Sequence, residues 1–147
     1  MKAETWCRKR VAGEVEMERQ VVNPWKWQDP LGFVQANKTT GAVRIAMCAG
    51  QLSVDADGHP LHAGDMSAQI EQALDNVETV LREAGLKFSD VVRLNYYVTD
   101  IDEFIAAGAT LGRRLVAGDC RPASTLLNVV RLAYPESMVE IEATAVA

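Results

Sequence analysis

Two glutamates near the C-terminal end have the residue type and spacing for acid–base chemistry. Glu140 and Glu142 lie in an otherwise apolar run over residues 138–146. Residues two apart on a strand point to the same face, roughly 7 Å apart. A carboxylate among apolar neighbours loses water, which raises its pKa and lets it carry protons near neutral pH. A solvated strand face, or ion pairs with Arg93 or Arg131, also accounts for the pattern, and the strand alone favours that simpler interpretation.

Two other segments could bind a ligand through backbone or hydroxyl groups. Gly50 and Gln51 follow an apolar run, where glycine lets a ligand approach the backbone closely, although a turn that ends a strand needs no ligand. Ser124 and Thr125 enter another apolar run, where their hydroxyls could bind a ligand or satisfy local backbone groups. The residues alone favour the simple turn at Gly50, and they favour neither interpretation at Ser124 and Thr125.

Cysteine and histidine chemistry has weaker support. Cys120 stands beside Arg121, whose charge could lower the thiol pKa, but no histidine is obviously placed as its base. His59 and His62 lie in a turn rich in aspartate and glycine, and a metal site needs more ligands converging in a fixed geometry. We therefore expect a solvated loop there and no metal ion.

The composition disfavours several classes of protein. The chain has 147 residues and a net charge of −5, without a basic stripe to bind phosphates, so we expect no nucleic-acid partner. No apolar run reaches the length of a membrane span, so we expect no membrane partner. Three widely spaced cysteines suggest no disulfide framework and fit a reducing compartment, which predicts a cytoplasmic protein.

The length indicates one domain. Residues 1–16 show no sustained period of two or of 3.6, so we expect an N-terminal extension there that is disordered or not native. The domain is then expected to span residues 17–147.

A helix over residues 65–84 is the clearest predicted element. Asp65 can cap its start and Gly85 can close its end. One apolar stripe of this helix is expected to be buried: Met66, Ile70, Ala73, Leu74, Val77, Leu81 and Ala84. A second helix is predicted from Asp100 or Asp102 to Gly118. Its expected buried side consists of Phe104, Ile105, Gly108, Leu111 and Leu115.

Alternation and turn residues predict the strands. Residues 32–36 and 42–48 are short apolar runs that flank the turn-forming residues 37–41, which predicts a hairpin. The other predicted strands are 91–99, 124–132 and 138–146. The expected buried faces are Val92, Leu94, Tyr96 and Val98 in the first of these, and Val139, Ile141, Ala143 and Ala145 in the last.

The resulting order, β-β-α-β-α-β-β, predicts an α+β fold with a mixed sheet and two helices on one face. Two helices can cover only one face of such a sheet. Apolar residues on the other face then need a partner subunit, so we expect an oligomer.

Four segments match those of one known family and occur in the same order along the chain. They are Ala49-Gly50-Gln51, the helical segment from Asp65 to Gly85, Tyr96-Tyr97-Val98-Thr99-Asp100 and Val139-Glu140-Ile141-Glu142-Ala143. Over roughly residues 20–147 the chain resembles the RidA (YjgF/YER057c/UK114) family. The resemblance implies a chorismate-mutase-like fold and a homotrimer with small-molecule pockets at its subunit interfaces. The best-known members deaminate reactive enamines and imines such as 2-aminoacrylate without a cofactor. Older descriptions call members translation inhibitors or endoribonucleases.

The resemblance also implies roles for single positions. Gly50, with Gln51 beside it, matches a backbone glycine of the family pocket, and Glu140 matches the glutamate that holds the attacking water. Phe33 takes the place of a pocket aromatic that is frequently tyrosine. Leu126 takes the place of a family cysteine.

The main departure from the family is at Ser124. Deaminating members have an arginine there, which grips the substrate carboxylate through paired hydrogen bonds. Removing such a partner weakens the binding of an acid by about 2–5 kcal/mol, so we expect a substrate other than 2-aminoacrylate. Arg113, Arg114 and Arg121 are the candidates for a substitute anchor.

Three functions stay open from the sequence. The first is hydrolysis of a small imine, enamine or related nitrogen compound, with Glu140 positioning water, the backbone at Gly50 orienting the substrate and Ser124 hydrogen-bonding to it. The second is a non-catalytic trimer that binds a small molecule or a protein, which would suit the missing arginine. The third is an endoribonuclease, which the acidic charge and the lack of a histidine pair disfavour.

Overall fold

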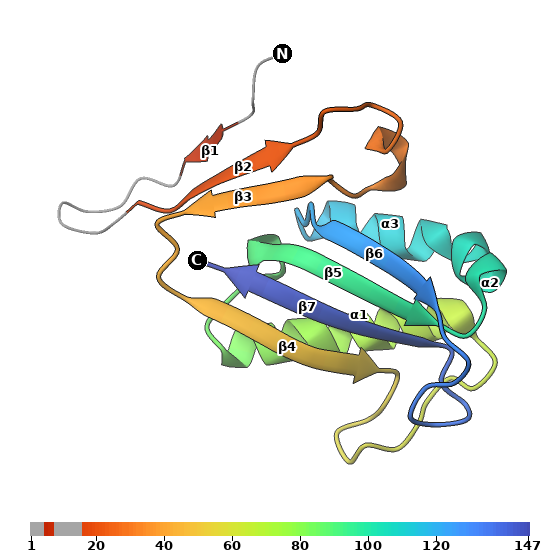
Figure 1. Cartoon of the computed structure of the whole chain (residues 1–147). Helices are drawn as coiled ribbons and strands as arrows, with labels where there is room; N and C mark the ends of the chain where they lie inside the picture. The colour runs from red at the N-terminus through yellow and green to blue at the C-terminus, as the bar shows by residue number, and fades with distance from the viewer. Residues whose placement is uncertain (1–4, 8–15) are drawn as a thin grey trace.

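A four-stranded mixed sheet forms the centre of the fold (Figure 1). The computed structural model describes residues 5–7 and 16–147. The strands lie in the order β4-β7-β5-β6, with β5 and β6 parallel and the other neighbours antiparallel. Their bounds are Ile45–Leu52 for β4, Val91–Val98 for β5, Ala123–Asn128 for β6 and Val139–Val146 for β7.

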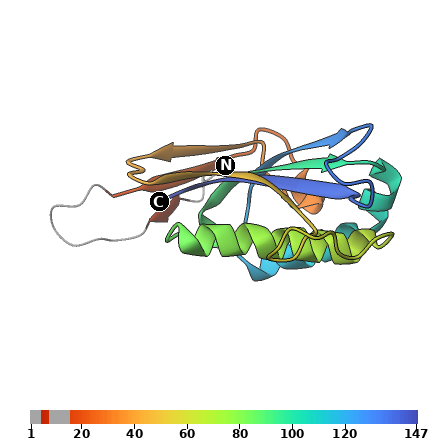
Figure 2. The same ribbon diagram turned by 90° about the horizontal axis from the view of Figure 1, so that it is seen from below.

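The helices lie on one side of this sheet (Figure 2). They are α1 (Met66–Glu83), α2 (Ile101–Ala106) and α3 (Gly108–Ala117), with short 3-10 helices at η1 (Asp29–Leu31) and η2 (Phe88–Asp90). We call the covered side of the four-stranded sheet the helix face and the other side the open face, which Figure 1 turns toward the viewer. The predicted α+β fold class is therefore confirmed.

The helix α1 forms as predicted because its capping residue, its closing glycine and its apolar stripe all favour a helix over the same residues. The Asp65 carboxylate accepts a hydrogen bond from the Ala68 backbone N–H at 2.9 Å, which caps the start. Gly85 follows the helix with a φ of 71°, a conformation that favours glycine. The predicted stripe is buried except for Ala84, which is exposed because it caps the helix at the C-terminal end.

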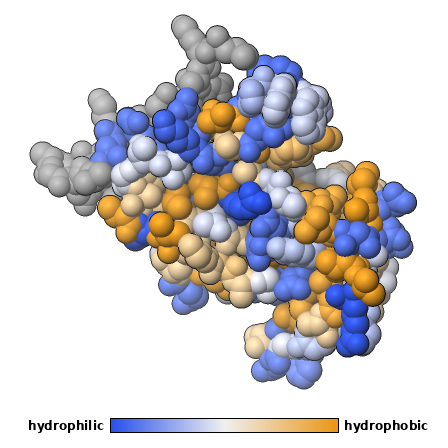
Figure 3. Space-filling model, viewed as in Figure 1, coloured by the Kyte–Doolittle hydropathy of each residue, from blue (hydrophilic) through white to orange (hydrophobic). Residues whose placement is uncertain are grey.

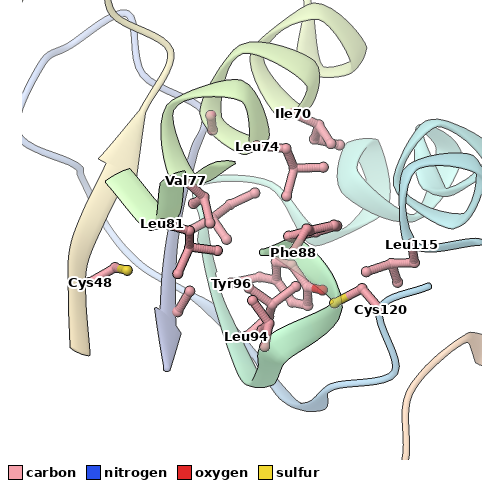
Figure 4. Packing of buried hydrophobic residues seen from close by; sticks show 14 of the residues in the cluster. Cys48, Ile70, Leu74, Val77, Leu81, Phe88, Leu94, Tyr96, Leu115 and Cys120 are labelled. Carbon is pink, nitrogen blue, oxygen red and sulfur yellow. The ribbon is translucent and has the colours of Figure 1, made fainter. Parts of the chain in front are cut away.

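The hydrophobic core lies between α1 and the helix face (Figure 4). Ile70, Leu74, Val77 and Leu81 of α1 are fully buried, and so is Leu94 of β5. Full burial of each such side chain is worth about 1.5–3 kcal/mol. This packing fixes which side of every strand faces inward, and so which side faces the open surface.

The second predicted helix is in fact two helices. The chain breaks at Ala107, which ends α2 with φ −83° and ψ 2° immediately before Gly108 starts α3. Glycine is a weak helix former, which favours a break at this position. Ile105, predicted to be buried, is 64% exposed because the short α2 turns Phe104 into the core instead.

The hairpin predicted around residues 37–41 is wrong. Those residues form most of β3 (Ala36–Thr40), which pairs with β2 (Glu18–Val22) in a second sheet that also contains β1 (Thr5–Cys7). The turn comes later, at Gly41, whose φ is 69°. From the predicted strand 32–36, Val34 forms an isolated bridge to Ala123.

Long-range hydrogen bonds explain why turn-like residues adopt a strand there. The Asn37 side chain donates to the Val92 carbonyl at 2.7 Å. Arg19, on the paired strand β2, donates to the carbonyls of Ser89 at 3.0 Å and Arg121 at 2.8 Å. These contacts hold the second sheet against the start of β5 and the loop before β6.

The predicted strands at β5 and β6 need smaller corrections. A register shift between Val91 and Arg93 buries Val91, while Val92, predicted to be buried, is half-buried. β6 ends at Asn128, earlier than predicted, although the next backbone N–H still donates to the Val98 carbonyl at 2.7 Å. β7 lies where it was predicted.

In the described part of the chain, no helix is long and apolar enough to cross a membrane. Residues Thr5–Cys7 of the predicted N-terminal extension pair with β2. The remainder of that extension, residues 1–4 and 8–15, lies outside the described residues.

The cap of α1 can be tested directly. Asp65→Ala should lower the free energy of unfolding by about 1 kcal/mol, because the Ala68 N–H loses its acceptor. Asp65→Ser keeps a capping oxygen and should retain most of that stability. Urea unfolding at one fixed protein concentration measures both, and equal losses in the two variants would contradict the capping role.

Candidate active site

The strand β7 places two carboxylates in the middle of the open face. Its residues alternate, with Val139, Ile141, Ala143 and Ala145 buried, as predicted. Glu140 and Glu142 are half-buried on the opposite side. Because β7 lies between β4 and β5, both glutamates are surrounded by neighbouring strands rather than placed at a sheet edge.

Glycine is required where β4 passes Glu140. The pairing of β4 with β7 shifts register between Cys48 and Gln51, so β4 bulges at Ala49 and Gly50. A methyl group on Gly50 would lie 2.7 Å from Cδ and 2.8 Å from Cγ of Glu140, and would overlap its carboxylate oxygen. The Glu140 side chain therefore lies directly over the backbone of Gly50. Gln51 lies next to this contact and donates from its side chain to the Ala49 carbonyl at 3.1 Å.

The surroundings of Glu140 disfavour the ionised form of its carboxyl. Partial removal from water raises the pKa of its carboxyl, and the negative charge of Glu142 raises that pKa further. A carboxyl whose pKa moves toward neutrality can act as a general base and then as an acid in one reaction cycle. The acid–base interpretation of Glu140 therefore stays a prediction, with which the raised pKa of this carboxyl is consistent.

Glu142 has the opposite environment. Its Oε1 atom accepts hydrogen bonds from the Asn95 side chain at 2.6 Å and from the Tyr97 hydroxyl at 2.8 Å. These bonds lower the pKa of Glu142, with a smaller contribution from the charge of Arg93. Both donors lie on β5, which pairs directly with β7.

Sequence reasoning missed these polar residues of β5 as parts of the site. Arg93 was considered there only as an ion-pair partner, and its guanidinium in fact donates to the Thr125 hydroxyl at 2.9 Å. Asn95 and Tyr97 alternate with the buried residues of β5, so the strand period places them on the open face. That period was a usable signal, whereas the contact with Glu142 depends on the register between the two strands.

Ser124 and Leu126 point to the helix face, away from Glu140. In the pairing of β5 with β6, Ser124 is opposite Leu94 and Leu126 is opposite Tyr96, and both of these β5 residues are buried. The Ser124 hydroxyl oxygen is enclosed. Burial raises the pKa of Tyr96, and the neighbouring Ser124 hydroxyl offsets part of that rise.

Phe33 lies at the outer edge of the sheet. The next residue, Val34, bridges to Ala123 and donates to the Pro122 carbonyl at 2.9 Å, which ties this segment to the start of β6. The ring of Trp27 meets Phe33 edge-on, with ring centroids 6.0 Å apart. Since β5 separates β6 from β7, this aromatic pair and Glu140 belong to different parts of the surface.

Two of the candidate substitute arginines are engaged between helices. Arg114 forms ion pairs with Glu71, Asp75 and Glu78 of α1 at 2.6, 2.8 and 2.7 Å. Arg113 pairs with Glu71 at 2.6 Å. Neither guanidinium is therefore directed to the open face, where Glu140 lies.

The third candidate, Arg121, is exposed in the loop before β6. Its backbone carbonyl accepts hydrogen bonds from the side chains of Arg19 and Asn37, which fixes the loop against the second sheet. The described structure brings none of the three arginines together with Glu140.

The cysteine alternative is not supported. Burial raises the pKa of the Cys120 thiol to about 12, which outweighs the lowering by Arg19. Only the thiolate is a strong nucleophile, so this side chain is poorly suited to attack a substrate.

The histidine loop contains one compact polar group. Ligand-type atoms of Asp55, Asp57 and His59 lie within 4.8 Å of one another. The Asp55 carboxylate already accepts the backbone N–H groups of Asp57 and His59, both at 2.9 Å, so hydrogen bonds inside the turn account for the arrangement. His59 and His62 are both exposed, as expected for a loop.

The open face also exposes apolar side chains (Figure 3). Met47 is 82% exposed, and Ile45 on the same strand and Leu127 on β6 are at least half exposed. Met47 and Ile45 lie on the strand next to β7, which carries Glu140 and Glu142, and Leu127 lies on the far side of β5. A face that combines apolar side chains with a polar centre is typical of a contact surface.

Comparison with known proteins places this geometry in context. The family model described as Endoribonuclease L-PSP matches residues 30–147. A RutC family protein of Pyrococcus abyssi is 28% identical over 130 residues, which is 88% of this chain and 98% of the relative. A 2-iminobutanoate/2-iminopropanoate deaminase of Salmonella typhimurium is 35% identical over 104 residues, 69% of this chain and 79% of the relative.

A solved structure agrees over most of the chain. The crystal structure of a protein of the conserved Rid family from Yersinia pestis superposes with a TM-score of 0.79 at 36% identity. The match covers 88% of this chain and 98% of the other. The chorismate-mutase-like architecture expected from the sequence is therefore confirmed.

The two carboxylates should titrate in a fixed order. Glu142 should ionise at a lower pH than a free glutamate, because Asn95 and Tyr97 donate to its charged form, and Glu140 at a higher pH, because it is desolvated and faces that charge. Side-chain carboxyl carbon shifts, followed by NMR from pH 3 to 8, measure both midpoints. If Glu140 ionised at a lower pH than Glu142, the electrostatic description of the site would be wrong.

Proposed function

We propose, because the chain belongs to the RidA (YjgF/YER057c/UK114) family, that it hydrolyses a small imine or enamine to a carbonyl compound and ammonia. One observation carries this proposal: Glu140, a carboxyl with a raised pKa, lies over the bare backbone of Gly50 in the centre of the open face. The named deaminase among the relatives supports the same reaction class.

The reaction needs one group that moves protons between water and nitrogen. As water adds to the imine carbon, Glu140 takes a proton from the water and passes it to the nitrogen, which gives a carbinolamine. Glu140 then takes the hydroxyl proton and delivers it to the same nitrogen. The C–N bond breaks with its electron pair leaving on nitrogen, and the carbonyl compound and ammonia depart. An enamine enters this sequence as its imine tautomer.

The site is proposed to be completed by a second subunit. Glu140, Gly50 and Gln51 lie on or beside the open face, whereas Phe33 and Ser124 lie at the β6 edge, with Ser124 turned to the helix face. Residues on opposite faces of one sheet cannot enclose one ligand. In the homotrimer that we propose, the β6 edge of one subunit, with Leu126, meets the open face of the next, and the pocket lies at their interface.

The substrate is proposed to be less anionic than 2-aminoacrylate. Arg113 and Arg114 are held by carboxylates of α1, and Ser124 offers an uncharged hydroxyl enclosed beside Tyr96. An acid substrate would lack a guanidinium partner from these residues. A neutral imine needs none, because its binding rests on the backbone at Gly50 and on apolar contacts.

A non-catalytic trimer that binds a small molecule is the second candidate. The enclosed Ser124 hydroxyl favours it, since a site without a polar anchor orients a substrate less precisely. Incubation with imines generated in situ separates the two. Ammonia release above the uncatalysed rate indicates an enzyme, whereas a rise in melting temperature without turnover indicates a binding protein.

Replacement of Glu140 tests the mechanism. Glu140→Gln keeps the size of the side chain but removes the base, so kcat should fall by about 100-fold or more. Glu83→Gln, which changes an exposed carboxylate at the end of α1, is the matched control and should keep full activity. Ammonia release from a panel of small imines measures both. Full activity in Glu140→Gln would exclude the proposed mechanism.

Gly50 tests the close contact independently. Gly50→Ala should displace the Glu140 side chain and lower kcat by about 100-fold, because a shift of about 1 Å is enough to misplace a catalytic group. Gly112→Ala in α3, where the added methyl meets no atom within 4 Å, should keep activity. Steady-state kinetics of both variants give the comparison, and equal activities would show that the contact has no role in turnover.

A further inference from the structure

Glu140 and Glu142 share a face of β7 but have different neighbours on β5. In the pairing of the two strands, Tyr97 is opposite Glu140 and Asn95 is opposite Glu142. The two glutamates are two residues apart, which places them roughly 7 Å apart along the strand. Their environments therefore differ although their chemistry and their orientation are the same.

The side chain of Glu142 is held by two donors at once. Asn95 and Tyr97 both donate to its Oε1 atom, at 2.6 and 2.8 Å. Hydrogen bonds to an ionised acceptor are shorter and stronger than those to a neutral one. The arrangement thus fixes the position of this carboxylate and favours its charged form.

Glu140 has no such clamp among the described residues. Gly50 lies beneath it with no side chain to hold it. Besides Glu142, the charged and titratable groups near the two glutamates are Tyr97 and Arg93 on β5. The Tyr97 hydroxyl already donates a hydrogen bond to Glu142. On β4, the residue opposite Glu140 is Leu52, which carries no charge, whereas Gln51 is opposite the buried Ile141.

We propose that Glu142, clamped by Asn95 and Tyr97, is a positioning residue that divides the work of the two carboxylates. Glu142 stays ionised through the cycle as a fixed anion, and Glu140 is the carboxyl that gains and loses the proton. This inference rests on the proposed function and adds to it a role for three further residues.

The division of roles has a chemical consequence. A fixed negative charge beside Glu140 disfavours its ionised form and so makes it the stronger base of the two. Without the charge of Glu142, Glu140 would hold its proton less tightly and accept a proton from water less readily. The division follows the general pattern in which paired titratable groups are driven apart by their environments.

Glu142→Gln tests this role because it removes the charge and keeps the shape. Two readouts are needed: the pH dependence of kcat/KM for a small imine generated in situ, and the NMR titration of Glu140 in the absence of substrate. In Glu142→Gln both the acid limb of the rate profile and the Glu140 midpoint should move to lower pH, since the neighbouring anion is gone. Glu142→Asp keeps the charge and should restore most of the wild-type profile.

Thr144→Val is the matched control. Thr144 lies two residues further along the same face of β7, so its replacement changes polarity there without a change of charge. Its rate profile and its Glu140 titration should match those of the wild type. Tyr97→Phe provides a second route if Glu142→Gln folds poorly, and it should raise the pH at which Glu142 itself titrates.

The outcomes separate this inference from the proposed function. An unmoved Glu140 midpoint in Glu142→Gln overturns the positioning role, whatever the activity. A midpoint that moves together with the acid limb supports it. The Glu140 midpoint could also move in Glu142→Gln while Glu140→Gln retains full activity. That result would confirm the charge coupling between the two glutamates but exclude the proposed reaction and the division of catalytic roles.

Discussion

The strand β7 is the element on which the site depends. Its alternate residues Val139 and Ile141 are fully buried under α1, so the burial of one face forces the intervening side chains outward. A register slip of one residue would bury Glu140 and Glu142 in the core, at a cost far above that of any single surface contact. The same packing that stabilises the domain therefore fixes where its carboxylates point.

Elements whose signals are local could be predicted from the sequence, and those set by distant partners could not. The helix α1 has its own cap, stripe and closing glycine, and β7 has its own alternation. By contrast β3 contains Asn37, a turn-forming residue, whose side chain bonds to a carbonyl 55 residues away. The local pattern predicted a hairpin because the sequence of β2, the strand that actually pairs with β3, has no strong strand signal and lies earlier in the chain.

The same distinction applies to the site. Glu140 and Gly50 could be singled out because each keeps a motif that resembles the family, and the structure adds that one lies over the other. The clamp on Glu142 is set by the register of β5 against β7, which no single segment encodes. The engagement of Arg114 was equally hidden, since it depends on how α3 packs across three carboxylates of α1.

Charge at the site bears on the form of substrate that the proposed reaction would favour. A ligand carboxylate about 5 Å from an ionised Glu142 would be repelled by about 1–3 kcal/mol at effective dielectric constants between those of water and a protein surface. That repulsion acts in the same direction as the absence of an arginine at Ser124. A protonated imine is a cation, so the same anion would attract it by a similar amount. Protonation also makes the imine carbon more electrophilic, which means that one fixed charge would both select the less anionic substrate and favour its reactive form.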